Sequence, residues 1–365
     1  MKKLLIALTI AVSAAISISG QKFEKPKLTP VAATAAQEAL IREGIALHNA
    51  RRYDEAIKKY EQVLSENPDC TFAIYELAFT QYAKPDKTAG VATARKGAGY
   101  KSPELGLFYI LIANDLDESG KSQEAIELYR DAIKYVKNDK TMDSQVASLS
   151  YNLAVAHLRR KENPEGRAAL KEGVLADFNH AGSNFLLAQV FSVSKYRIPA
   201  FLAASRFMGI DQGNNARTQR AAAMIMDVLK KPEKNEKTGN IVINVDFFAP
   251  KDEGEFGMYD LLGAISGVET DKDKKENKTE NERFADSYAS MIGMLAQDKK
   301  LKDTFVGRTY IPYLDALKKA GHHEALAYMV LQEAGNLEAT KWISLNSRKI
   351  SEYQEWSKAY RLAVK

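Results

Sequence analysis

The sequence predicts a mainly α-helical protein, with a solenoid of stacked helical hairpins over residues 37–230 and a smaller, mostly helical region over residues 283–365. Two observations predict the solenoid. Small and apolar residues recur at helical spacing, and the pattern around Ala56 returns around Ala125, 69 positions later. That separation is close to two repeats of about 34 residues, the length of a common helical-hairpin repeat.

The clearest unit begins at Gln37 and ends at Pro68, which stops one helix so that the next can start. Each of its two helices has one apolar face. These faces are formed by Leu40, Gly44 and Leu47, and by Ala56, Tyr60 and Val63. The small Gly44 and Ala56 allow the two helices to approach closely. This unit resembles a tetratricopeptide repeat (TPR) almost position for position.

The same template recurs down the chain, sharply in one further unit and in eroded form in the others. The later units span Thr71–Glu104, Leu105–Asp139, Ala147–His180 and Ala181–Gln212, and the helix Ala216–Leu229 closes the series as a cap. The resemblance implies about five repeats stacked as a right-handed superhelix, because one hairpin cannot bury its apolar face alone. It also implies that the first helix of each repeat lines a concave groove.

The N-terminus has the pattern of a secretory signal peptide over residues 1–20. A basic start, Met1–Lys3, precedes the apolar run Leu4–Ile18 and then small residues up to Gly20. The apolar run is shorter than the roughly 20 residues that span a bilayer. We therefore expect cleavage near Gly20, a linker over residues 21–36, no transmembrane segment after cleavage, and an exported protein that is soluble in the periplasm or secreted.

Composition limits the partners. The formal net charge of +5 includes Lys2 and Lys3, so the mature chain would carry about +3, too small an excess to indicate nucleic acid. Cys70 is the single cysteine, so no disulfide can form within the chain, and we expect it to be buried and inert. The sequence leaves self-association open.

Aromatic and apolar side chains mark a candidate binding groove. Four aromatics recur at spacings of three and four on the helix face opposite Leu77 and Ala78, and residues in two later repeats occupy matching places. The predicted groove residues are Phe72, Tyr75, Phe79, Tyr82, Tyr151, Val155 and Phe185. We interpret them as anchors for an extended or helical peptide of a protein partner. The alternative is that these rings pack against an adjoining repeat or against a folded-back C-terminal region.

TPR domains that bind the acidic C-termini of chaperones use a clamp of Lys, Arg and Asn on the groove helices. At the corresponding places this chain has apolar residues or glycine, namely Ile41, Ile45, Gly182 and Leu186. Asn114 and Asn152 are present but lack basic partners that could fix a carboxylate. The sequence therefore predicts that this clamp is absent.

Composition changes after the solenoid. Residues 231–282 read as a charged linker with one strand, Ile241–Phe248, a short helix, Tyr259–Ile265, and a solvated loop, Glu269–Glu282. From Arg283 onward the pattern is helical again. This C-terminal region resembles the tail of uncharacterised exported bacterial TPR proteins, and that resemblance supplies no activity for it.

No motif in the sequence indicates an enzyme. His322 and His323 are adjacent, so their side chains would point about 100° apart on a helix and would not bind one metal. The chain lacks a P-loop, GxGxxG and GxSxG. We therefore predict no catalytic residues, no metal and no cofactor. Three functions remain: an exported protein-binding scaffold, a cell-envelope polysaccharide-binding or enzymatic protein whose site lies in the C-terminal region, and a self-assembling structural solenoid.

Overall fold

A computed structural model of the chain describes residues 23–211, 213–229, 233–234, 241–242, 252–266, 268 and 270–363. The predicted signal peptide and most of the predicted strand Ile241–Phe248 lie outside these residues. Two short strands, β1 (Glu233–Lys234) and β2 (Ile241–Val242), pair antiparallel. Within the described ranges, no helix is both long and apolar enough to cross a membrane.

The first two-thirds of the chain form a series of helical hairpins, each packed against the next. The pairs are α1 (Ala35–Asn49) and α2 (Tyr53–Glu66), α3 (Thr71–Tyr82) and α4 (Thr88–Gly97), α5 (Leu105–Glu118) and α6 (Ser122–Val136), α7 (Asp143–Arg159) and α8 (Asn163–Ala176), and α9 (Ala181–Val193) and α10 (Arg197–Ile210). A short 3₁₀ turn, Lys140–Met142, precedes α7, and α11 (Ala216–Leu229) follows the last pair. The predicted solenoid, including its closing helix, is confirmed.

Four of these hairpins share one turn geometry. A single left-handed residue stands between the two helices: Arg51 (φ 61°), Gly120 (φ 79°), Lys161 (φ 62°) and Lys195 (φ 65°). In the third hairpin, the amide after Gly120 donates back to the Leu116 carbonyl at 2.8 Å, which satisfies one of the free carbonyls at the end of a helix. The repeated turn gives these four hairpins the same connection between their two helices.

The first hairpin is packed as its sequence predicts. A Cβ atom added at Gly44 would lie 2.4 Å from Cε1 of Tyr60, so only glycine allows α1 and α2 this close approach. Ala56 and Tyr60 are fully buried in a small core of the first repeat. Cys70 belongs to the same core and burial raises the pKa of its thiol, as expected for an inert cysteine.

Residues 23–33, here called the N-terminal strap, lie across the loops that join the first three hairpins. The Leu28 amide donates to the Gly99 carbonyl at 2.9 Å, and the Val31 amide donates to the Asp69 carbonyl at 3.0 Å. These bonds tie the α2–α3 and α4–α5 loops to one extended segment. The sequence predicts a linker here, because bonds between backbone atoms leave no pattern in the side chains.

The strap begins with an aromatic contact. The Phe23 ring lies 4.9 Å from the Tyr109 ring on α5 and 5.3 Å from the Tyr135 ring on α6. The Tyr109 hydroxyl donates to the Glu24 carbonyl at 2.7 Å. The strap therefore reaches from the first hairpin to the third.

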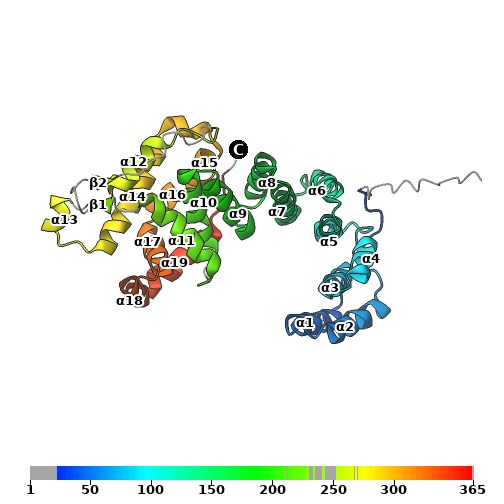
Figure 1. Cartoon of the computed structure of the whole chain (residues 1–365). Coiled ribbons are helices and arrows are strands. Elements are labelled where there is room, and N and C mark those ends of the chain that lie inside the picture. Colours follow the sequence, from blue (N-terminus) through cyan, green and yellow to red (C-terminus); the bar gives the residue numbers. More distant parts are fainter. Residues whose placement is uncertain are drawn as a thin grey trace, which may run out of the picture.

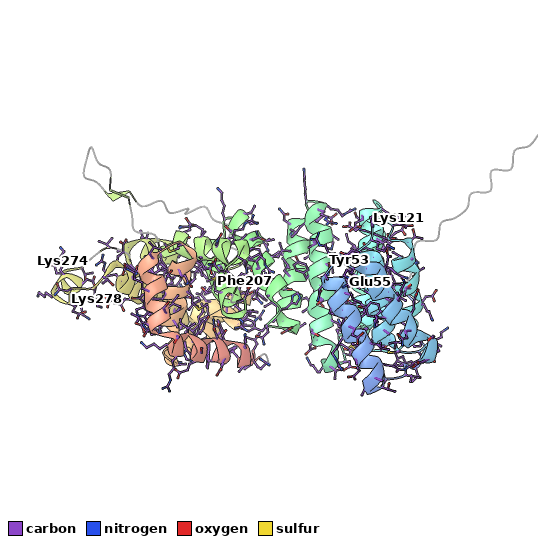
Figure 2. The ribbon with its side chains drawn as sticks, turned by 90° about the horizontal axis from the view of Figure 1, so that it is seen from below. Tyr53, Glu55, Lys121, Phe207, Lys274 and Lys278 are labelled. Carbon is purple, nitrogen blue, oxygen red and sulfur yellow. The ribbon has the colours of Figure 1, made fainter. Side chains whose placement is uncertain are left out.

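Figure 1 shows the hairpins arranged as an arc, with α1, α3, α5, α7 and α9 on its inner side and α2, α4, α6 and α8 on its outer side. The C-terminal helices gather beside the end of the arc at α10 and α11. Figure 2 shows Tyr53 and Glu55 towards one end of the molecule, Lys274 and Lys278 at the other, and Phe207 between them. The inner side is thus built from the first helix of each hairpin, as the family resemblance implies.

The C-terminal region is helical apart from its connections. Its helices are α12 (Gly257–Ser266), α13 (Asp271–Lys275), α14 (Glu280–Gln297), α15 (Phe305–Arg308), α16 (Tyr310–Lys319), α17 (His323–Glu333), α18 (Leu337–Leu345) and α19 (Ser347–Ala359), with a 3₁₀ turn at Lys299–Asp303. Helices α14, α16 and α17 pack on one another, and this region packs against α10 and α11. The sequence predicts a loop at Glu269–Glu282, but α13 and the start of α14 lie there, each begun by a threonine capping box.

A buried arginine joins the C-terminal region to the solenoid. Arg206 on α10 is fully buried. Its guanidinium donates to the Phe178 carbonyl at 3.2 Å, to the Ser357 hydroxyl on α19 at 2.9 Å, and to the Asn179 side chain. It also lies 4.5 Å from the centre of the Tyr313 ring on α16. Among the described residues, hydrogen bonds and aromatic faces rather than a carboxylate compensate for the buried charge.

Candidate partner-binding face

Helix α3 is apolar on two opposite faces. One face is buried in the solenoid through Ala73, Ile74, Leu77 and Ala78. The other face, here called the α3 face, consists of Phe72, Tyr75, Glu76, Phe79 and Tyr82. Because residues three and four apart on a helix are neighbours, these five side chains form one continuous row.

The two phenylalanines of the α3 face are exposed. Phe72 keeps 38% and Phe79 keeps 39% of its surface accessible in the described structure. Tyr75 is half-buried, with its ring stacked on Phe79 at 5.9 Å and set edge-on to Phe108 of α5 at 6.0 Å. Burial raises the pKa of Tyr75 to about 12, so its phenol stays neutral. The α3 face is therefore an aromatic surface in which the Tyr75 ring packs against both Phe79 and Phe108.

His48 of α1 extends this platform. Its ring stacks on Phe79 at 4.9 Å, and its Nδ1 lies 2.9 Å from the Thr80 hydroxyl. Burial lowers the pKa of His48, which favours the neutral ring at neutral pH. The sequence prediction omitted His48, although His48 lies 34 positions before Tyr82 and so holds the same place one repeat earlier. Repeat register, applied to α1, would have found it.

Glu76 is a half-buried carboxylate within the aromatic row. Burial raises the pKa of Glu76 above its ordinary value. Among the described residues, none donates a hydrogen bond to this carboxylate or forms an ion pair with it. A carboxylate in this setting keeps part of its hydration, and a cationic or hydrogen-bond-donating partner would stabilise it.

An ion pair borders the far end of the α3 face. The Lys87 ammonium lies 4.6 Å from the centre of the Tyr82 ring and pairs with Glu118 of α5. On α5, the Asn114 side chain accepts a hydrogen bond from the Tyr129 hydroxyl at 2.6 Å, so it is engaged within its own hairpin. The Asn152 amide likewise donates to the Ser148 carbonyl at 2.8 Å.

The structure brings together the four aromatics of α3 but separates them from the other predicted groove residues. Tyr151 and Val155 lie half-buried on α7, where the Tyr151 ring is 6.0 Å from His180. Phe185 of α9 is buried at 8% exposure, with its ring 4.8 Å from that of Phe207. Leu186, the next residue, is partly exposed.

The described C-terminal region leaves the α3 face uncovered. Helix α3 packs against α1, α2, α4 and α5, whereas the C-terminal helices pack against α10 and α11. The exposures of Phe72 and Phe79 are those in the presence of all described residues. The described part of the C-terminal region therefore does not pack over the α3 face.

A cavity of about 820 Å³ lies between the α9–α10 turn and helices α12 and α14. Several of its polar groups are engaged: Arg197 pairs with Asp260 at 3.3 Å, and the Tyr259 hydroxyl donates to Asp298 at 2.7 Å. Across the described ranges, no three His, Cys, Asp or Glu side chains gather as a metal site requires.

The two tryptophans are also in contact with neighbouring rings. Trp342 stacks on Tyr328 at 3.9 Å, and Trp356 stacks on Tyr313 at 5.6 Å. Both are half-buried. Each therefore has one ring face occupied by another aromatic side chain, as expected for residues at the edge of the core.

Two family models described as tetratricopeptide repeat match the chain, over residues 37–70 and 110–181. Among solved structures, it is similar to a thermophilic TPR protein of Thermus thermophilus (17% identity, 52% of this chain and 99% of that one, TM-score 0.42). It is also similar to the TPR domain of P58(IPK) (14% identity, 89% of this chain and 98% of that one, TM-score 0.25). No curated protein matches it. The two family matches show that this chain contains tetratricopeptide repeats.

Proposed function

We propose that this protein is an exported TPR scaffold that binds a peptide segment of a protein partner in its concave groove, with the α3 face as the anchor. The observation that carries the proposal is the pair of exposed rings, Phe72 and Phe79, on α3, a helix of the inner side of the arc (Figure 1). Exposed aromatic clusters are unfavourable in water and commonly mark interaction sites. Neither ring is needed to close the hairpin core.

The platform suits a peptide because it is already ordered. Phe79 is held between His48 and Tyr75, so little side-chain entropy is lost when a partner covers it. Rigid aromatics at the centre of an interface often contribute about 2 kcal/mol or more each. Half-buried Leu107 and Ile110 of α5 and Tyr151 and Val155 of α7 could extend the contact along the inner side.

The test is a peptide-display selection against the full mature chain, followed by affinity measurements on the selected peptides. We expect Phe79→Ala to weaken them by about 2 kcal/mol or more, which is close to thirtyfold. Leu175→Ala is the matched control, because Leu175 is an apolar residue on α8, an outer helix, with 46% exposure. Selected peptides that bind Phe79→Ala and Phe72→Ala as tightly as the wild type would refute the proposal.

Export is the second part of the proposal, and it rests on the sequence of residues 1–20. The expected result is a mature protein in the cell-envelope fraction or the medium that begins close to residue 21. N-terminal sequencing checks this directly. Protein from that fraction that still begins at Met1 would contradict cleavage.

The alternative, a polysaccharide-binding or enzymatic site in the C-terminal region, would use the cavity beside α12 and α14. Its specific support is the volume of that cavity and the aromatic residues Phe256 and Tyr259 in its lining. A screen of cell-envelope oligosaccharides by calorimetry separates the two functions. Saccharide binding that Tyr259→Ala abolishes and Phe79→Ala leaves unchanged would favour the alternative.

A further inference from the structure

The α3 face combines aromatic rings with a carboxylate that lacks a partner among the described residues. Glu76 lies one helical turn from both Phe72 and Phe79, so all three side chains open onto the same side of α3. Basic groups of α1, of the α3–α4 loop and of α7 pair with other acids: Arg42 with Glu38, Lys87 with Glu118, and Arg159 with Asp117. None of these cations neutralises Glu76.

A second carboxylate adds to this charge. Asp115 of α5 is half-buried and close enough to Tyr82 to help raise the pKa of that phenol. Like Glu76, it has no side-chain hydrogen bond or ion pair with any residue in the described part of the chain. His48, whose ring is neutral when its pKa is lowered, does not offset either charge. The two carboxylates therefore leave the aromatic row with unbalanced negative charge.

We infer that the segment bound at the α3 face presents a basic side chain, arginine or lysine, which lies over Phe79 or Phe72 and pairs with Glu76. This inference rests on the proposed function and specifies the chemistry of its partner. A guanidinium fits best, because it stacks on an aromatic ring and also donates two parallel hydrogen bonds to a carboxylate. Apolar neighbours in the same segment would cover the remaining rings.

The test uses defined peptides rather than an unknown partner. Short, N-acetylated and C-amidated peptides with mixed Leu, Ile, Phe and Ala flanks carry Arg, Lys, Gln or Glu at one central position. Binding to the full mature chain is measured by fluorescence polarisation. We expect the Arg and Lys sets to bind at least about tenfold more tightly than the Gln set, and the Glu set to bind most weakly.

Three variants assign this preference to Glu76. Glu76→Gln should reduce the Arg-over-Gln preference to less than about threefold, and Glu76→Lys should reverse it in favour of the Glu set. Glu61→Gln is the matched control, because Glu61 is an exposed acid on α2, an outer helix. Circular dichroism confirms that each variant is folded, which is expected because Glu76 makes no bond that the fold needs.

Equal binding of the Arg and Gln sets, or a preference that survives in Glu76→Gln, overturns the inference. Failure of the proposed function looks different. In that case either no peptide set binds, or the sets that bind do so equally well to Phe79→Ala. Loss of binding in Phe79→Ala together with equal binding of the Arg, Lys, Gln and Glu sets would support peptide binding at the α3 face. It would contradict only the inference that the bound segment carries a basic side chain.

Discussion

Helices α3 and α10 are both apolar around most of their circumference, but they have different surroundings. Every residue of α10 from Ile198 to Gly209 is buried, because its own repeat covers one side and the C-terminal helices cover the other. The neighbours of α3 cover only one side, and Phe72 and Phe79 remain exposed. Packing within the chain therefore explains why α10 is apolar on all sides. The composition of α3 is accounted for only if something outside the described residues covers it.

Helices α10 and α3 also differ in their place within the hairpin. Helix α10 is the second helix of its hairpin and serves as the attachment point of the C-terminal region. Helix α3 is the first helix of its hairpin and faces the inner side of the arc. Attachment at α10 and α11 leaves the inner side of the first hairpins open.

The largest expected effect concerns α10, where the C-terminal region packs against the solenoid. Arg206→Ala should lower the free energy of unfolding by about 3 kcal/mol or more, because it removes four hydrogen bonds and leaves a cavity between α10 and α19. Denaturant unfolding measures the loss, with Arg220→Ala on the exposed side of α11 as a control. A loss below about 1 kcal/mol would mean that α10 is not the attachment point.

The next effect concerns the first hairpin, whose core is small. Gly44→Leu should destabilise it by about 1–3 kcal/mol, because any side chain there meets the Tyr60 ring. Ala46→Leu on the exposed side of α1 is the matched control. Hydrogen exchange should show faster exchange confined to the first repeats. Equal stability of the two variants would contradict the close approach of α1 and α2.

A smaller effect is expected at the strap. Phe23→Ala should cost about 1 kcal/mol, the typical contribution of an aromatic pair, through loss of its contacts with Tyr109 and Tyr135. Limited proteolysis should then cleave the strap earlier while leaving α7 to α19 protected. Proteolysis unchanged from the wild type would show that the strap does not depend on Phe23.

The smallest effect is the pH dependence contributed by Glu76. Its pKa in the folded protein is raised by burial, so the folded protein binds this proton more readily than the unfolded chain. Stability therefore rises as the pH falls through the folded pKa towards the unfolded value of about 4.3. Glu76→Gln should be more stable than the wild type at neutral pH, and the difference should shrink on acidification. Thermal melts across this pH range check the sign, and a difference that grows in acid would contradict it.

Much of the hairpin architecture could be predicted from periodicity. The closing helix Ala216–Leu229 has the predicted bounds, because an amphipathic pattern bounded by turn residues is a strong local signal. The prediction of a loop at Glu269–Glu282 is wrong because it rests on charge composition alone. The segment also contains two threonine capping boxes, each of which begins a helix. The sequence predicts a linker at the strap, because the hydrogen bonds that hold it to the α2–α3 and α4–α5 loops are made by backbone atoms.

The candidate site was predictable only in part. Spacing alone placed Phe72 and Phe79 on a face away from the core, and both are exposed. Phe185 stands two residues before Leu187, as Tyr75 stands two before Leu77, so repeat register supports its assignment to the same face. It is nevertheless buried, because its ring packs against Phe207 of α10. Repeat register could have indicated His48, whereas the role of Arg206 depends on contacts with residues distant in sequence, which no local pattern encodes.

The central claim is that a partner covers the α3 face, and site-specific photo-crosslinking tests it most directly. A photoreactive phenylalanine analogue replaces Phe79 in one variant and Leu175 on the outer helix α8 in another, and both are irradiated in intact cells. We predict a discrete adduct with a second protein at position 79 that is absent at position 175, and crosslinked peptides that map to one segment of that protein. No adduct at position 79, or the same adducts at both positions, would contradict the claim.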